Sequence, residues 1–246
     1  MDYKELQKHF ILSQSLYFTD FFLTLCMLVA IVTCVIFLRR KNSYLFLIYS
    51  GTAFSLMNDD YVYILFSRKD LLDKSLEYGN LIFAILELLV FLQFFRRPLK
   101  LKMIKIITNT VMGLYFIVLL FFFIFYLPKH PTHNEITRFS DFYISSELLC
   151  LFSFCLLYYF SLFSKRSGRK QLSSPFLWTV HGLFIYTIII IPFFMLDTPI
   201  REMSRKFDDI AYAVHYTTFG FLFLGIAKTV ISQKESVSSE PSISVK

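Results

Sequence analysis

Several residue types that carry familiar chemistry are scarce in this sequence. Its 4 cysteines show no CxxC spacing, and we interpret them as apolar packing residues rather than as disulfide partners or metal ligands. Its 7 glycines form no phosphate-binding loop, and neither a serine nucleophile elbow nor zinc-finger spacing occurs. The sequence therefore lacks the short motifs that identify many nucleotide-binding proteins, serine hydrolases and zinc-finger proteins.

Histidine and lysine are scarce inside the apolar runs. A three-histidine zinc site of the membrane-hydrolase kind needs three well-placed histidines, whereas only His181 and His215 lie within such runs, at different depths. A retinal pigment requires a lysine near the middle of a span, and the best-placed one, Lys228, lies at the end of a run. We therefore predict no metal site, and the sequence leaves any cofactor unknown.

Apolar and aromatic residues, by contrast, are abundant. Hydrophobic residues make up 56% of the 246 residues, and phenylalanine alone appears 31 times. A soluble domain of this size cannot bury so much apolar surface, so the composition indicates a membrane protein. The runs are continuous rather than alternating, which favours helices over barrel strands. We predict an all-α integral membrane bundle of seven transmembrane helices, at residues 15–38, 43–66, 76–95, 104–127, 139–163, 174–196 and 207–231.

The charges of the predicted loops alternate along the chain. The first, third and fifth loops hold twelve cations and no acid: Arg39, Arg40, Lys41, Arg96, Arg97, Lys100, Lys102, Lys105, Lys165, Arg166, Arg169 and Lys170. By the positive-inside rule, this pattern predicts an outside N-terminus and a cytoplasmic C-terminus, in the cytoplasmic membrane. The net charge of +7 then reflects orientation and lipid headgroup contacts rather than nucleic-acid binding. We expect a disordered cytoplasmic tail at 232–246, too short for an output domain.

Ionisable side chains inside the predicted helices are the best functional candidates, because such groups are costly in a membrane. Glu87 shares a face of its helix with Glu77 and Asn80, and Tyr143 lies one turn from Glu147. Most of these groups fall in the outer half of the bundle. We therefore predict a polar, carboxylate-lined cavity open to the outside, with a proton, cation or ligand site formed by Glu87, Glu147, His215, Asp59, Asp60, Tyr143, Asp208 and Tyr212. The alternative is that these groups bond to neighbouring hydroxyls and only hold helices together.

Four stretches carry a resemblance to known proteins: EYGNLIFAILELLVFLQFF, FSDFYISSELLCLFSFCLLYYFSLF, SSPFLWTVHGLFIY and IAYAVHYTTFGFLFLGIAK. They resemble a group of small, uncharacterised seven-helix integral membrane proteins of Bacteroidota. In that group a glutamate recurs in the third helix, another in the fifth and a histidine in the seventh, which fall here on Glu87, Glu147 and His215. A Ser-Pro-Phe-Trp-like entry into the sixth helix, followed by glycine and tyrosine, falls on Ser174, Pro175, Trp178, Gly182 and Tyr186.

The resemblance implies a layout similar to the seven-helix sensing regions that precede signalling domains in bacterial receptors. This chain departs from those receptors because it has no output domain, so a signal would need a partner. The Asn58-Asp59-Asp60 run is not a feature of the group.

Three functions fit these observations. The favoured one is a sensor-like or ligand-binding protein, which would hold a small or lipid-like ligand or a cation and pass a change in helix packing to a membrane or cytoplasmic signalling partner through the basic inner loops. The first alternative is an intramembrane hydrolase that acts on lipids or depends on a metal, with carboxylates as acid, base or metal ligands. The second is a proton- or cation-coupled transporter, and a structural or accessory subunit is left as a further role. A non-enzymatic role is favoured.

Overall fold

The computed structural model describes residues 3–40, 42–57, 69–96, 99, 102–126, 129, 133–164, 175–203 and 205–238. Within these ranges the chain forms helices and short turns and no strand. Seven α-helices and one π-helix make up this part: α1 (Tyr3–Ile36), α2 (Ser43–Met57), α4 (Lys69–Phe95), α5 (Lys102–Phe121), η1 (Phe122–Tyr126), α6 (His133–Ser164), α8 (Leu177–Met203) and α9 (Arg205–Ser238). The predicted all-α class is confirmed.

Five of these helices are long and apolar enough to cross a membrane: α1, α4, α5 with η1, α6 and α9. The apolar parts of α2 and α8, Ser43–Met57 and Leu177–Phe193, are shorter. Large apolar side chains also cover the outside of the bundle, and on α5 the exposed ones include Ile106, Leu114, Phe116, Ile117 and Phe121. A surface of this kind is suited to lipid rather than to water. Length, composition and surface therefore all indicate a membrane-embedded helical protein.

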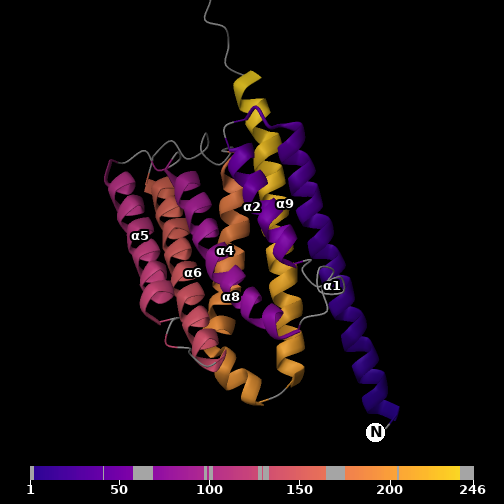
Figure 1. Cartoon of the computed structure of the whole chain (residues 1–246). Coiled ribbons are helices and arrows are strands. Elements are labelled where there is room, and N and C mark those ends of the chain that lie inside the picture. Colours follow the sequence, from indigo (N-terminus) through magenta and orange to yellow (C-terminus); the bar gives the residue numbers. More distant parts are fainter. Residues whose placement is uncertain are drawn as a thin grey trace, which may run out of the picture.

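Helix ends differ from the predicted boundaries because a helix continues wherever its backbone bonds do, even beyond the apolar run. α4 begins at Lys69 rather than at 76, and α9 ends at Ser238, inside the segment predicted to be a disordered tail. Residues 58–66 of the predicted helix 43–66 lie outside the described residues. α8 continues through Pro192 and Pro199, and its end turns away from the bundle in Figure 1.

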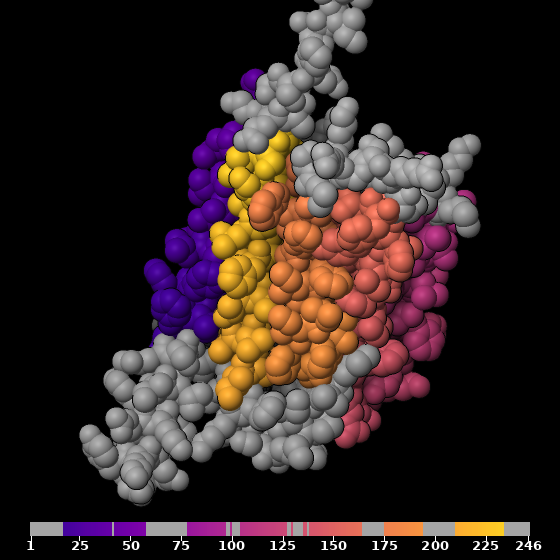
Figure 2. Space-filling model, turned by 180° about the vertical axis from the view of Figure 1, so that it is seen from behind, coloured from indigo at the N-terminus to yellow at the C-terminus, as the bar shows by residue number. Residues whose placement is uncertain are grey.

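Six of the helices form a closed ring. Going round it, α1 packs on α2, α2 on α4, α4 on α6, α6 on α8, α8 on α9, and α9 again on α1. α5 lies outside the ring and packs on α4, at the opposite edge of the molecule from α1 (Figure 1). Seen from behind, α9, α8 and α6 lie side by side between these two edges (Figure 2). Successive helices run antiparallel, so the ends of α1, α4 and α6 lie at the same end of the bundle as the end of α9 (Figure 1).

The contact between α8 and α9 depends on small residues. A Cβ atom added to Gly225 would lie 2.6 Å from the backbone oxygen of Trp178, and one added to Gly182 would lie 3.0 Å from the Cα atom of Leu222. The Thr179 hydroxyl donates a hydrogen bond of 2.8 Å to the Thr229 hydroxyl across the same contact. Close backbone approach and hydroxyl bonding are the usual means by which helices associate in membranes. This contact fixes α8, which carries one of the residues of the site described next.

Candidate functional site

Two glutamates from neighbouring helices of the ring lie close together in its interior. Glu87 of α4 is 3% exposed and Glu147 of α6 is fully buried. They are close enough for their charges to interact. No lysine or arginine approaches either carboxyl group among the residues that the structure describes. We call Glu87 and Glu147 the acidic pair.

The two members of the pair are bonded differently. The hydroxyl of Tyr49, on α2, donates a hydrogen bond of 2.8 Å to Oε1 of Glu87. Neither oxygen of Glu147 has a hydrogen-bond partner in the described part of the chain. A buried polar group without a partner costs about 1–3 kcal/mol in protein mutational data. Glu87 is therefore held in place, while Glu147 occupies a position that does not satisfy its carboxyl group.

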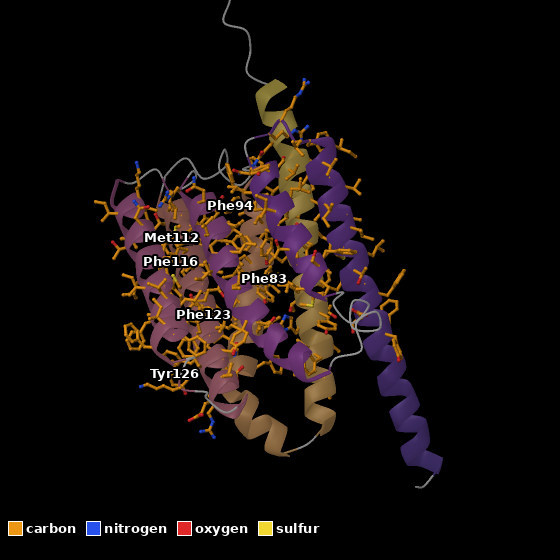
Figure 3. All side chains as sticks on the ribbon, in the orientation of Figure 1. Phe83, Phe94, Met112, Phe116, Phe123 and Tyr126 are labelled. Atoms are coloured by element: carbon orange, nitrogen blue, oxygen red, sulfur yellow. The ribbon has the colours of Figure 1, made fainter. Side chains whose placement is uncertain are left out.

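Aromatic rings pack around Tyr49, the hydrogen-bond partner of Glu87. Tyr49 is fully buried, and its ring stacks on Phe83 and Phe223 at centroid distances of 5.4 and 5.6 Å, with Phe91 edge-on at 5.2 Å. Figure 3 labels Phe83, on α4, near the middle of the bundle. This packing removes water from around the pair and lowers the local dielectric constant, which strengthens every electrostatic interaction of the two carboxyl groups.

Tyr186 of α8 links the acidic pair to α9. It is 4% exposed and interacts electrostatically with both Glu87 and Glu147. Its ring lies edge-on to that of His215, with centroids 5.8 Å apart. Tyr186 thus lies between the acidic pair and His215, and a direct contact of His215 with the carboxyl groups stays a prediction.

A second tyrosine layer adjoins Glu147 on the side of α5. Tyr143, one turn before Glu147, is 2% exposed, but its hydroxyl donates to the backbone oxygen of Tyr115 at 3.2 Å rather than to Glu147. Tyr115, Tyr143 and the partly buried Cys150 all interact electrostatically with Glu147. Tyr143 therefore lies near Glu147 with its hydroxyl bonded elsewhere, and its part in a ligand site stays a prediction.

Of the remaining predicted site residues, only Tyr212 has a described side chain. Tyr212 is 46% exposed, and its ring packs near that of Tyr216 at a centroid distance of 6.3 Å. Asp208 lies in α9, with its side chain outside the described part. Asp59 and Asp60 lie outside the described residues. The outer rim of the predicted cavity would be built from these residues, so its opening to the outside stays a prediction.

Sequence reasoning missed two members of the site. No catalytic or binding motif separates Tyr49 and Tyr186 from the other tyrosines of the chain. Tyr186 entered only as part of the motif shared with the Bacteroidota group. The depth of each tyrosine within its helix could have identified it. Tyr49 lies six residues after Ser43 and Tyr186 nine residues after Leu177, well inside apolar helices.

Metal binding and relationships to known proteins give no further assignment. Within the described ranges, no three side chains of His, Cys, Asp or Glu come together in a way that could hold a metal ion. Comparisons with models of protein families, with curated proteins and with solved structures find no match to this chain.

Proposed function

We propose that this protein is a proton-responsive membrane protein of the sensor type, in which the acidic pair binds a proton. The observation that carries the proposal is the carboxyl group of Glu147, which is fully buried, unpartnered in the described part of the chain and next to a second carboxyl group. Two ionised carboxylates in a water-poor interior repel one another, and one added proton removes that repulsion. Without a counter-ion, the interaction between the two carboxyl groups therefore depends on whether one of them holds a proton.

The proton suits this site better than a larger ligand does. Glu87 is 3% exposed and Glu147 is fully buried, so almost no surface of the pair is open to a ligand. A proton needs no cavity of its own, whereas an organic ligand needs a pocket of about 300 Å³ or more. This enclosure is the reason for which we choose the proton among the small ligands and cations that the sequence leaves open.

Protonation at the pair would reach the rest of the bundle through helix packing. Glu87 and Glu147 belong to α4 and α6, which pack on one another, and Tyr49 and Tyr186 extend the site to α2 and α8. A change of charge at the pair therefore alters the balance of forces between helices on both sides of the ring. A signal results only if the proton binds one arrangement of the helices more tightly than another.

The proposal also includes the number of spans, their orientation and the membrane in which the protein lies. We propose seven spans, an outside N-terminus, a cytoplasmic C-terminus and residence in the cytoplasmic membrane, as in the Bacteroidota group that the sequence resembles. The signal would pass to a membrane or cytoplasmic partner at the basic loops. Charge alternation between the loops supports this orientation.

Infrared spectroscopy of the purified protein in lipid nanodiscs tests the proposal. A protonated carboxyl group absorbs separately from a carboxylate, so we expect a protonated-carboxyl band that changes with pH in the native protein. Glu147→Gln and Glu87→Gln should each remove most of that change. Glu135→Gln, an exposed position on the same helix as Glu147, should leave it intact. A band that responds equally in all three variants would contradict proton binding at the pair.

The same pair also fits a proton-coupled transporter, the runner-up function. Proton flux in vesicles distinguishes the two. The sensor proposal predicts that a pH gradient across proteoliposomes is dissipated no faster than in vesicles that contain the Glu147→Gln variant. Faster dissipation that needs Glu147 would favour the transporter.

A further inference from the structure

A groove lies between α4 and α5 on the outside of the bundle, and neither glutamate of the acidic pair lines it. Its volume is about 340 Å³. Leu88 forms part of its floor and is 1% exposed, while Leu89 and Phe116 form its walls and are 37% and 58% exposed. Met112 and Phe116 lie one below the other along α5 (Figure 3). The groove is therefore apolar along most of its length, and in a membrane its open side would face lipid.

One end of the groove is polar and positively charged. Asn109 lines this end and accepts a hydrogen bond from the guanidinium group of Arg96. Arg96 is held there by two further bonds, to Thr108 at 2.8 Å and to Gln93 at 2.9 Å. Lys105, one turn before Asn109 on α5, is exposed. Arg96 and Lys105 thus lie next to Asn109 at one end of the groove, and the rest of its lining is mostly apolar.

The groove is preformed by packing on its inner side. Tyr115, which lines it, is fixed from behind by the bond from the Tyr143 hydroxyl to its backbone oxygen. A Cβ atom added to Gly113 would meet no atom within 4 Å, so the open space at this position is real and is not taken up by a neighbouring side chain. A long, flexible apolar chain could fill this space without any change in the helices.

We propose that this groove binds an anionic phospholipid, with an acyl chain between α4 and α5 and the headgroup at Arg96 and Lys105. The apolar lining of the groove suits an acyl chain, and the negative headgroup suits the two cations next to Asn109. An acyl chain gains little by moving from bilayer to groove, since both are apolar, so the headgroup charge selects the lipid. Basic pockets between helices at one membrane face are the usual binding sites of anionic lipid headgroups.

Native mass spectrometry of the detergent-purified protein tests this proposal, with phosphatidylglycerol and phosphatidylcholine of identical acyl chains added in turn. We expect phosphatidylglycerol to remain bound at higher occupancy than phosphatidylcholine. Gly113→Leu, which fills the groove, should lower retention of both lipids, and Lys105→Gln should remove the preference between them. Gly51→Leu is the matched control, because Gly51 also has no atom within 4 Å of an added Cβ but lies on α2. Lys228→Gln is the matched control for the loss of charge. Lys228 lies on α9, where its ammonium group is 6.0 Å from the Trp178 ring.

Three results would overturn the proposal. The first is equal retention of the two lipids by the native protein, because the headgroup would then not be recognised. The second is full phosphatidylglycerol retention in Gly113→Leu, because the groove would then not be the site. The third is a change of oligomeric state in Gly113→Leu with lipid content unchanged, because the groove would then hold a second copy of the chain. None of these outcomes depends on whether the acidic pair binds a proton. If Gly113→Leu fails to fold, the lipid preference of Lys105→Gln, a substitution at an exposed position, still tests the proposal.

Discussion

Replacing each glutamate of the acidic pair by methionine should change stability in opposite directions. Glu147 is fully buried, and neither of its oxygens has a hydrogen-bond partner in the described part of the chain. Methionine is close to glutamate in length and is flexible enough to occupy the same space. Glu147→Met therefore removes a buried unsatisfied group, which is worth about 1–3 kcal/mol.

The same substitution at Glu87 has a different cost. It removes the acceptor of the 2.8 Å hydrogen bond from Tyr49 and leaves that hydroxyl buried and unpaired. An orphaned donor costs about 1–3 kcal/mol, and this loss offsets what is gained by removing the Glu87 carboxyl group. We expect Glu87→Met to be neutral or destabilising, and Glu147→Met to be stabilising.

The assay is the apparent melting temperature of each purified variant in one detergent at one pH. One kilocalorie per mole shifts the melting temperature of a chain of this length by about 2–4 °C, so a gain of about 1–3 kcal/mol in Glu147→Met should raise it by roughly 2–12 °C. Leu151→Met is the control for methionine itself, because Leu151 is fully buried on the same helix as Glu147. A melting temperature that falls as far in Glu147→Met as in Glu87→Met would show that Glu147 makes a stabilising contact, and the inferred asymmetry of the pair would be wrong.

Three further predictions follow from the described contacts. Tyr49→Phe should lower stability by about 1 kcal/mol, since it removes the donor to Glu87, and thermal unfolding measures the loss. Gly225→Ala should cost about 1–3 kcal/mol, because its Cβ would lie 2.6 Å from a backbone oxygen of α8, whereas Gly51→Ala, with open space around it, should be neutral or stabilising by about 0.5–1 kcal/mol. A fluorescent reporter fused after Lys246 should be active on the cytoplasmic side, and activity of a periplasm-specific reporter there would reverse the proposed orientation.

The fold class could be read from the sequence because membrane insertion imposes a simple rule. Long, continuous apolar runs with few glycines and prolines form helices, since every backbone group must bond within its own segment in lipid. The ends of the helices follow a looser rule. The polar residues 69–75 continue α4 outward from its apolar run, because nothing in water forces a helix to stop where the membrane does.

The acidic pair could be predicted only in part. Glu87 and Glu147 stand out as carboxyl groups in apolar helices, and depth along each helix suggested that they meet. The hydrogen bond between Tyr49 and Glu87, by contrast, depends on α2 and α4 being neighbours in the ring. Sequence periodicity gives the face of each helix but not the order of helices around a bundle, so it could not separate Tyr49 from tyrosines at the interface.

The two glutamates of the acidic pair differ in hydrogen bonding, which indicates a structural role for Glu87 and a functional one for Glu147. A glutamate that only joins helices should have a hydrogen-bond partner, as Glu87 has in Tyr49. Glu147 lies within the same apolar interior without such a bond among the described residues, and a methionine or leucine there would pack as well at lower cost. Sites that lower stability in this way tend to be kept for activity rather than for folding. Glu147 is therefore the residue at which we expect the stability of this bundle and its function to conflict, so that the variant with the highest melting temperature should also be the one that no longer responds to the proton.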